Sequence, residues 1–392
     1  MSSRLAVMVF ALVVVTVGIG WNLSRLESFP PKMPPLDFVE YWAAANLLAR
    51  GENPYDPARM EIWERRAGRE DDVLMMWNPP WVLPLVLPLV HTSLDMGRFY
   101  WLILHLGAIL GSAALLWNVY EGRPGWIGIG MALSLLWFPT FEVLRLGQIT
   151  PLMLLGAGAF LVLERRRWDF AAGAVSCLLA IKPQLLYLFW LALLVWAVAQ
   201  NRWRLLLGGA VTGLFLSAVA LALRPSIFSD YWVLARQGPT GYASPTLGYL
   251  ARHFLNSPHF AWQYAPMVPG LAWLVWYGWR RRRDWAWSDA MPWLVGISLL
   301  TTMYGAWLFD LVLLLVPVLH LACRLSGPVP ARWRIAGLAA HLALGVAGFM
   351  QLQYQPGIQY VHFMWFTPFL LGIYGIFLSC SPEKAPVLHG NE

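Results

Sequence analysis

Apolar runs separated by short polar loops dominate the pattern of this chain. After a first run at residues 5–21, further runs occur at approximately 99–117, 126–144, 151–163, 170–183, 184–199, 205–223, 266–279, 287–305, 311–323, 335–352 and 361–378. Several are shorter than the roughly 20 residues that a helix needs to cross a bilayer at right angles. They carry little charge, however, and tight loops join them. The pattern predicts an all-α, polytopic transmembrane helical bundle of about 11–13 spans.

The run at residues 5–21 has the character of a signal peptide's apolar core. No small-residue cleavage pattern follows it, and many further apolar runs do. We therefore expect an uncleaved first helix.

Arginines mark every second loop between the apolar runs, which sets the expected orientation. They are Arg165–Arg167, Arg202, Arg204, Arg280–Arg283, Arg332 and Arg334. Loops rich in Lys and Arg remain in the cytoplasm. The opposite, extracytoplasmic side would then receive residues 24–98, 182–184, 224–265, 304–310 and 353–360.

The short apolar segment at residues 79–91 decides whether this orientation is consistent. Counting it as a full crossing would invert every later loop, including the arginine cluster at 165–167. Its four prolines favour a broken or re-entrant element instead, because proline interrupts helical hydrogen bonding. The alternative is that residues 126–146 fold back at Pro139.

Composition supports a membrane protein. Of 392 residues, 58% are hydrophobic and 12% are charged, with a mean hydropathy of +0.54, whereas soluble domains carry about 25% charged residues. The net charge of +7 comes largely from the loop arginines and is no sign of nucleic-acid binding. Cys177, Cys323 and Cys380 lie in or beside apolar runs without metal-like spacing, so we expect buried thiols. No repeat or second domain is visible, which predicts one domain over residues 1–392.

Two extracytoplasmic loops, 24–78 and 224–265, are large enough to build a site. The first holds ten acidic and seven basic residues. Within it, Asp37 stands at a natural N-cap position, and Gly51 suits the end of the helix that follows. We expect a short amphipathic helix along the membrane face, then a second helix near 58–67. The loop 224–265 mixes aromatic residues with arginines, Arg236 among them.

The stretch from Asp37 to Asp56 reads D-F-x-E-Y-W-x-A-A-x-x-L-x-x-G-x-N-P-Y-D. It resembles the opening motif of multispanning glycosyltransferases of the C type, and most of all family 87, which includes mycobacterial polyprenyl-phosphate-mannose-dependent mannosyltransferases. Further similar segments follow in order, namely Trp77–Pro80, Arg145–Gln148, Ala171–Gly173, Lys182–Pro183 and Tyr304–Asp310. The chain departs from the family pattern at Trp77 and at Gly305.

The resemblance implies a glycosyltransferase-C fold in a bacterial inner membrane, with the active site on the extracytoplasmic side. The implied donor is a hexose, mannose-like, on a polyprenyl phosphate, and the implied acceptor is a lipid-linked or envelope glycan. Transfer would be inverting and would need no cofactor. The partners would be this donor, the acceptor and membrane lipids, with no nucleic acid.

Such a reaction needs a base on the acceptor hydroxyl and positive charge on the departing phosphate. By resemblance, Asp37 is the catalytic base. Lys182, Arg145 and Gln148 are the expected ligands of the donor phosphate. The residues expected to bind the acceptor are Glu40, Tyr41, Trp42, Tyr304, Asp310 and Arg236. No His/Asp cluster suggests a metal ion.

Simpler interpretations compete with these roles. Asp37 could be only a helix cap. Glu40 could be solvated or bonded to loop backbone. Lys182 and Arg145 could extend to the membrane surface, as cations at span ends often do. Asp310 is different because apolar residues surround it. A carboxylate at a span centre costs roughly 2.5–3.5 kcal/mol, and even near a span end a partner or a wet cavity is expected.

Two other functional classes are also compatible with a protein that has many membrane spans. A transporter or flippase of lipid-linked substrates would have a midplane site between internal repeats. No such halves are visible, and that class leaves the 24–78 loop unexplained. A scaffold without catalytic activity is the third possibility. Product formation from a radiolabelled polyprenyl-phosphate sugar separates the enzyme from both.

Overall fold

The computed structural model describes residues 36–237, 243–355 and 359–380. Over these residues the chain is entirely helical, with α-helices α2 to α18, short 3-10 segments and no strand. The all-α prediction is therefore confirmed. The run at residues 5–21 and the part of the 24–78 loop before residue 36 lie outside the described residues.

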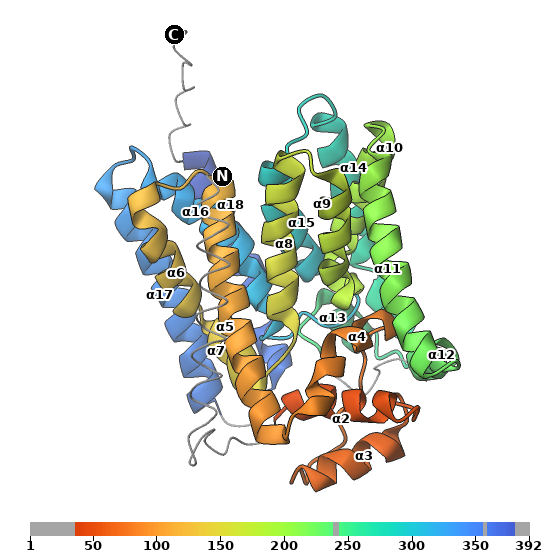
Figure 1. Cartoon of the computed structure of the whole chain (residues 1–392). Coiled ribbons are helices and arrows are strands. Elements are labelled where there is room, and N and C mark those ends of the chain that lie inside the picture. Colours follow the sequence, from red (N-terminus) through yellow and green to blue (C-terminus); the bar gives the residue numbers. More distant parts are fainter. Residues whose placement is uncertain (1–35, 238–242, 356–358, 381–392) are drawn as a thin grey trace.

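Most helices run back and forth between the two ends of the molecule (Figure 1). They are α5 (Leu94–Val119), α6 (Ile127–Leu135), α7 (Phe138–Leu146), α8 (Thr150–Arg165), α9 (Asp169–Ser176), α10 (Tyr187–Ala199), α11 (Trp203–Leu223), α14 (Met267–Arg280), α15 (Trp287–Thr301), α16 (Leu315–Ser326), α17 (Ala331–Tyr354) and α18 (Phe366–Cys380). One end also carries α2 (Phe38–Ala49), α3 (Pro57–Arg66), α4 (Leu83–Val86), α12 (Ile227–Gln237) and α13 (Leu247–Phe254).

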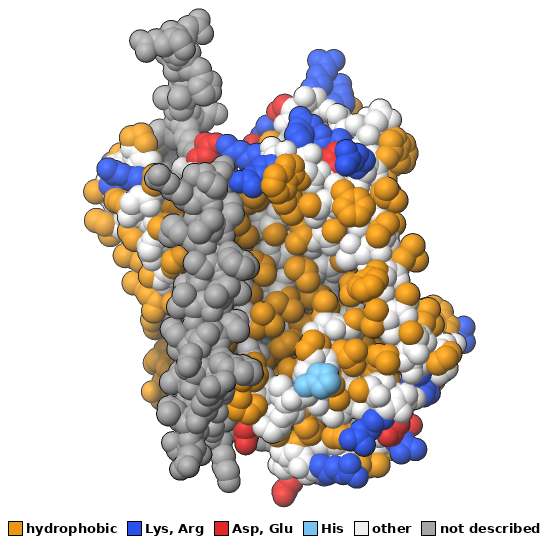
Figure 2. Space-filling view, viewed as in Figure 1, with side chains coloured by type: hydrophobic (Ala, Val, Ile, Leu, Met, Phe, Trp, Pro, Cys, Tyr) orange, Lys and Arg blue, Asp and Glu red, His pale blue; other side chains and the backbone are white. Residues whose placement is uncertain are grey.

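The end opposite α2 carries the arginine loops, and we call it the basic end. Lys and Arg side chains gather there in the space-filling view (Figure 2). Ion pairs tie several of its loops together: Arg165 contacts Glu121, while Arg202 contacts Glu164 and Asp169. The loops that alternate in sequence thus separate in space, and α2 and α3 lie at the other end (Figure 1).

Few of the helices are long enough to span a bilayer alone. In the described part of the chain, four helical segments pass on length and composition: α5, α11, α17 and Tyr360–Cys380. Two bent pairs raise the number to six, 124–146 with a bend of 61° and 169–199 with a bend of 120°. The sequence-based count of 11–13 also included runs that fold into shorter helices, such as α14 to α16. Breaks at proline explain part of the difference, because proline removes a helical hydrogen bond.

The segment at residues 79–91 folds as a short apolar helical element, Pro80–His91, and is not among the candidate spans. It starts against α11 and ends in the 3-10 turn Leu87–His91, which packs on α2. The segment therefore returns to the α2 end, as expected of a re-entrant element. The pair 124–146 bends but carries the chain from the basic end to the α2 end (Figure 1).

The outer surface of the bundle is apolar over much of its height (Figure 2). Leu214, Val275 and Ile376 are among its most exposed side chains, which suits contact with lipid. Of the three thiols, Cys323 is buried and Cys177 is half-buried. Cys380 is exposed at the end of α18, so the expectation of a buried thiol is wrong there.

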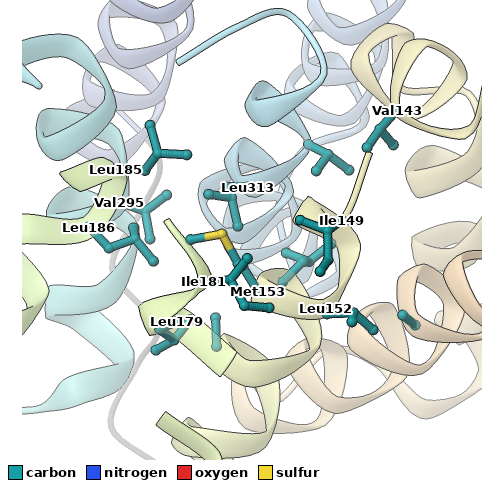
Figure 3. Packing of buried hydrophobic residues seen from close by; sticks show 14 of the residues in the cluster. Val143, Ile149, Leu152, Met153, Leu179, Ile181, Leu185, Leu186, Val295 and Leu313 are labelled. Carbon is teal, nitrogen blue, oxygen red and sulfur yellow. The ribbon is translucent and has the colours of Figure 1, made fainter. Parts of the chain in front are cut away.

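A tightly packed aliphatic core surrounds the polar groups of the site. Ile149, Met153, Ile181, Leu185 and Leu313 are all fully buried and pack together between the helices (Figure 3). They come from α8 and its N-cap residue Ile149, and from the chain segments next to Lys182 and Asp310. Polar groups among them are largely shielded from bulk water, so leaving them without a partner is costly.

Candidate active site

Helix α2 is buried rather than spread along the membrane face. Its first ten residues include only one, Trp42, that is not buried, so the apolar positions cover nearly the whole circumference. The alanines Ala43 to Ala45 permit close packing because their side chains are small. Helix α2 contacts α3, α4, the Leu87–His91 turn and α5. The prediction of an amphipathic surface helix is wrong, because other parts of the loop fold over its outer face.

Asp37 stands at the N-cap position of α2, as predicted, but its side chain makes no capping hydrogen bond. Instead its Oδ2 accepts a hydrogen bond of 2.9 Å from Nε2 of Gln148. The carboxylate is thus oriented by a residue 111 positions away. The interpretation of Asp37 as only a helix cap does not fit this geometry.

Gln148 links Asp37 to two further residues. Its Oε1 accepts hydrogen bonds from the Tyr41 hydroxyl (2.9 Å) and from Nζ of Lys182 (3.2 Å). Nζ of Lys182 also donates to Oδ1 of Asp310 at 2.8 Å. Only 13% of the Lys182 side chain is exposed, so it turns into the protein and does not extend to the surface. Asp37, Gln148, Lys182 and Asp310 form one continuous chain of contacts, which we call the polar network.

Asp310 is fully buried, and both of its carboxylate oxygens accept hydrogen bonds. Besides Lys182, its Oδ1 accepts a hydrogen bond of 2.6 Å from the Thr150 hydroxyl, and its Oδ2 accepts one of 3.2 Å from the backbone N–H of Trp307. The Lys182 ammonium also lies 4.8 Å from the ring centre of Phe309. The partner expected for this carboxylate is therefore present, and charge pairing offsets part of its desolvation.

Breaks in the helices bring these residues together. Lys182 has non-helical backbone angles between two 3-10 segments, Cys177–Ile181 and Pro183–Leu186. The proline that follows disfavours helical geometry at Lys182. Gly147 ends α7 with φ +78°, and a Cβ there would lie 2.9 Å from Cβ of Phe38. This glycine lets α2 approach closely enough for Asp37 to reach Gln148.

Arg145 is near the network but belongs to a different set of contacts. Its guanidinium binds the buried Glu142 through two hydrogen bonds, at 3.2 and 2.8 Å, and its side chain is 39% exposed. Arg98 on α5 donates to the backbone carbonyl of Arg145 at 2.9 Å. Arg98 is buried, and its Nη1 has no hydrogen-bond partner among the described residues. Sequence reasoning missed Arg98; an arginine immediately before the apolar run 99–117 was the available signal.

A small cavity of about 80 Å³ adjoins the network. Its lining comprises Glu40, Tyr41, Trp77, Asn78, Gln148, Ile181, Lys182, Gln184, Tyr304, Gly305, Trp307, Phe309 and Asp310. Larger hollows lie elsewhere: an apolar one between α6, α16, α17 and α18, and a polar one lined by loops of the basic end. Neither of these two includes any residue of the polar network. The small cavity is therefore the better candidate for the reaction.

Glu40 lies in this cavity wall and is 7% exposed. The interpretation of Glu40 as a solvated carboxylate is wrong, because helix α2 is covered. Burial raises the pKa of Glu40 well above its ordinary range, the negative charge of Asp37 raises it further, and Lys182 acts in the opposite direction. Burial also raises the pKa of Asp37, but there the Gln148 hydrogen bond and the cations Arg69, Lys182 and Arg145 favour the charged form.

The other expected acceptor ligands divide into two groups. Tyr41, Tyr304 and Asp310 line the cavity. Trp42 does not, because its indole N–H donates to the carbonyl of Thr92 at 3.3 Å and its ring packs on Trp63. Arg236 is exposed on α12, with its guanidinium 5.2 Å from the ring centre of Trp232. The structure therefore does not bring Trp42 or Arg236 to the cavity.

No group of three or more His, Cys, Asp or Glu side chains in the described residues is arranged to hold a metal ion. The positive charge near Asp37 comes from Lys and Arg side chains. Electrostatic stabilisation of an anion here would use these cations.

Comparison with known proteins places the chain in a family. The profile of Glycosyltransferase family 87 matches residues 77–348, which is more than half of the chain. The matched region contains Gln148, Lys182 and Asp310, whereas Asp37 and Glu40 precede it. The chain matches no curated protein and no solved structure. A transferase is thereby favoured over a transporter. Together with the apolar helices and the polar network, the match shows that the chain belongs to glycosyltransferase family 87 and is a membrane glycosyltransferase.

Proposed function

We propose that the protein transfers a mannose-like hexose from a polyprenyl phosphate to a lipid-linked or envelope glycan, with inversion at the anomeric carbon. Asp37 acts as the general base. The observation that carries this proposal is the position of the Asp37 carboxylate, which makes no capping hydrogen bond and is held by Gln148 beside the cavity. Family membership supplies the reaction class.

The chemistry requires one proton transfer and one displacement. Asp37 takes the proton of the acceptor hydroxyl, and the acceptor oxygen forms a bond to the anomeric carbon. The bond from that carbon to the phosphate oxygen breaks, and its electron pair leaves with the polyprenyl phosphate. The raised pKa of Asp37 makes its carboxylate a stronger base, while the hydrogen bond from Gln148 and the surrounding cations favour the ionised state that the reaction needs.

The departing phosphate gains negative charge, which a nearby cation stabilises. Lys182 is the cation in the cavity wall, and Gln148 is within its reach at 3.2 Å. Arg145 adds positive charge from outside the network. Lys182 forms an ion pair with Asp310. We infer that the donor phosphate binds Lys182 while this ion pair remains in place.

The different character of the two ends of the molecule supports a proposal for sidedness. Arginine-rich loops favour the cytoplasm, so the α2 end faces the extracytoplasmic side of a bacterial inner membrane. Single cysteines at Arg59, exposed on α3, and at Arg282, exposed after α14, test this in a background lacking the native thiols. An impermeant outside reagent should label position 59 in intact cells. Labelling of 282 with protection of 59 would reverse the orientation.

The function itself is tested with purified protein, radiolabelled polyprenyl-phosphate mannose and glycolipid acceptors. We expect product from this donor and none from a nucleotide sugar. Lys182→Ala should raise the KM for the donor more than the KM for the acceptor. Arg282→Ala, which removes a cation at the basic end, serves as the matched control. Transfer from the nucleotide sugar alone would refute the proposed donor class.

A further inference from the structure

Glu40 has an unusual position for a carboxyl group. It lies three residues after Asp37 on the same helix and lines the cavity together with Lys182 and Asp310. Its neighbours Asp37 and Asp310 both accept hydrogen bonds. The Glu40 carboxyl has no hydrogen-bond or ion-pair partner among the described residues. A buried polar group without a partner costs about 1–3 kcal/mol, so this carboxyl is available for a ligand.

The charges around the cavity bear on the state of Glu40. Lys182 and Asp310 form an ion pair, and their charges cancel. The charged or titratable groups that face Glu40 are Asp37 and Tyr41 at the start of α2, Lys182, Tyr304 and Asp310 across the cavity, and Glu64 on α3. An ionised Glu40 would give the lining a net negative charge and would repel an anionic phosphodiester. A neutral Glu40 removes that repulsion and supplies an O–H donor.

The rest of the wall contains side-chain types that bind sugars. Trp77, Tyr304 and Trp307 contribute aromatic surface, and Asn78 and Gln184 contribute amides. Aromatic rings offer flat apolar faces, and the amides and carboxyl offer directed hydrogen bonds to hydroxyl groups. The side chain of Asn78 is fixed, because its Nδ2 donates to the carbonyl of Ile181 at 3.1 Å.

We infer that Glu40 enters the reaction as a neutral carboxylic acid and donates a hydrogen bond to a hydroxyl oxygen of the hexose carried by the donor. The cavity thus holds the transferred sugar, with its phosphate toward Lys182, while the acceptor approaches from the Asp37 side. Glu40 is then a specificity-determining residue and not a second base. This inference rests on the proposed function and adds the site of the donor sugar.

The test measures donor and acceptor KM between pH 6 and 9 for the wild type, Glu40→Gln and Glu40→Leu. The amide of Gln can donate the same hydrogen bond, so we expect Glu40→Gln to keep kcat within a few-fold. Leu cannot, so Glu40→Leu should raise the donor KM by roughly tenfold, as expected for one lost hydrogen bond, with the acceptor KM unchanged. The wild-type donor KM should rise toward alkaline pH as Glu40 ionises, and this rise should disappear in Glu40→Gln.

Thermal stability of each variant controls for folding, and Glu61→Gln on α3 removes an exposed carboxyl that does not line the cavity. Loss of transfer in Glu40→Gln as severe as in Asp37→Asn would make Glu40 the base and overturn the inference. An unchanged donor KM and pH profile in folded Glu40→Gln and Glu40→Leu would also overturn it, while leaving the proposed function intact. Absence of any transfer by the wild type from polyprenyl donors would overturn both.

Discussion

Helices α2 and α3 pack against each other at the same end of the molecule, yet their carboxylates have different surroundings. Asp56 caps α3 by accepting hydrogen bonds from the backbone N–H groups of Ala58 and Arg59. Asp37 occupies the same position before α2 and does not cap it. The surroundings of an aspartate therefore depend on the partner that its oxygens bind, and not on its position relative to the helix.

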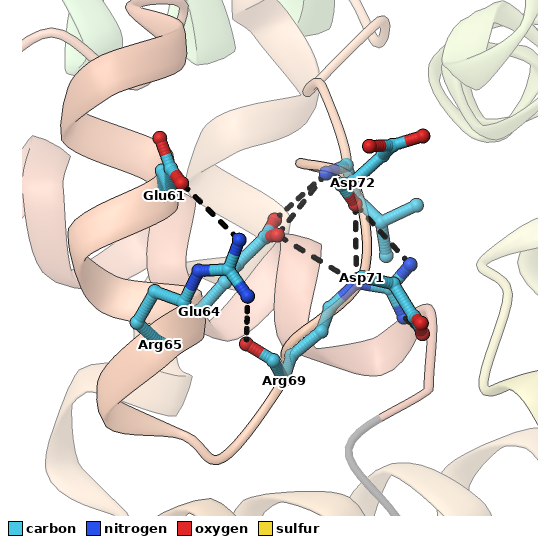
Figure 4. Close-up of polar contacts among 7 residues, drawn as sticks. Glu61, Glu64, Arg65, Arg69, Asp71 and Asp72 are labelled. Carbon is cyan, nitrogen blue, oxygen red and sulfur yellow. Dashed lines mark hydrogen bonds and ion pairs between the residues drawn. The ribbon is translucent and has the colours of Figure 1, made fainter.

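The glutamates of α2 and α3 also differ in the partners that they bind. On α3, Glu61 pairs with Arg65, and Glu64 accepts the backbone N–H of Leu74 with both oxygens and lies 3.7 Å from Nε of Arg69 (Figure 4). These contacts hold the chain that leads from α3 toward Trp77. Glu40 on α2 faces the cavity instead. Glu64 on α3 thus binds the loop that follows its helix, whereas Glu40 on α2 lines the cavity.

Asp37→Asn should cause the largest loss of activity. Asparagine keeps the size of the side chain and an oxygen that can accept from Gln148, but it cannot take a proton at neutral pH. We expect kcat to fall by roughly a hundred- to ten-thousandfold, the usual contribution of a general base, with normal membrane insertion. Asp56→Asn, at the corresponding position of α3, is the matched control and should keep turnover. Near-normal turnover in Asp37→Asn would remove the contrast between the two helices.

Gln148→Leu should have an intermediate effect on the same reaction. The variant loses the hydrogen bond that orients Asp37, and a hydrogen bond to a charged group contributes about 1.5–3 kcal/mol, so kcat should fall at least tenfold. That bond also lowers the pKa of Asp37. Without it the pKa rises, and the acid limb of the pH–rate profile should move to higher pH. An unmoved acid limb, measured beside an exposed Gln237→Leu control, would contradict the positioning role.

Glu64→Gln should change stability and leave catalysis nearly unaffected. Burial raises the pKa of Glu64 to about 7, partly offset by the Leu74 hydrogen bond and by Arg69. A raised pKa in the folded state means that stabilisation is complete below the ordinary carboxyl pKa and is lost as pH rises toward 7. The loss amounts to at most about 3 kcal/mol.

Thermal unfolding in detergent between pH 4 and 8 measures this effect. The wild-type Tm should fall as pH rises, and the slope should be smaller in Glu64→Gln, because the amide keeps one acceptor for Leu74 and does not ionise. Glu61→Gln, which removes an exposed pair worth less than about 0.5 kcal/mol, should retain the wild-type slope. If Tm of Glu64→Gln falls with pH as steeply as that of the wild type, groups other than Glu64 cause the pH dependence.

The sequence predicts which charged residues gather beside the cavity better than it predicts their contacts. Lys182 and Asp310 stand out because each is charged beside apolar runs, where an unpaired charge is costly. Their pairing across 128 residues depends on the break at Pro183 and on how η7 (Asp310–Leu314) packs on α8, which no local pattern encodes. Arg236 shows the converse: its arginine and aromatic surroundings suggested a ligand, yet α12 places it away from the cavity.

The helical class of the fold also follows from the apolar runs, because backbone groups in lipid must bond within their own segment. The apolar runs do not, however, predict where the helical segments bend or break. The runs at 170–183 and 184–199 read as two segments, but they are the two arms of one pair bent by 120° around Lys182. Similarly, the sequence of α2 predicts a surface helix, but segments that follow it in the chain cover its outer face.

The polar network also constrains how the protein is made. Its four members come from chain segments that leave the ribosome at very different times, and Asp310 is the last of them. Until the segment after residue 310 has inserted, Lys182 is already in the membrane without its carboxylate, a costly state in lipid. Chains truncated before residue 310 lack the carboxylate that pairs with Lys182 and should therefore insert less stably than complete chains.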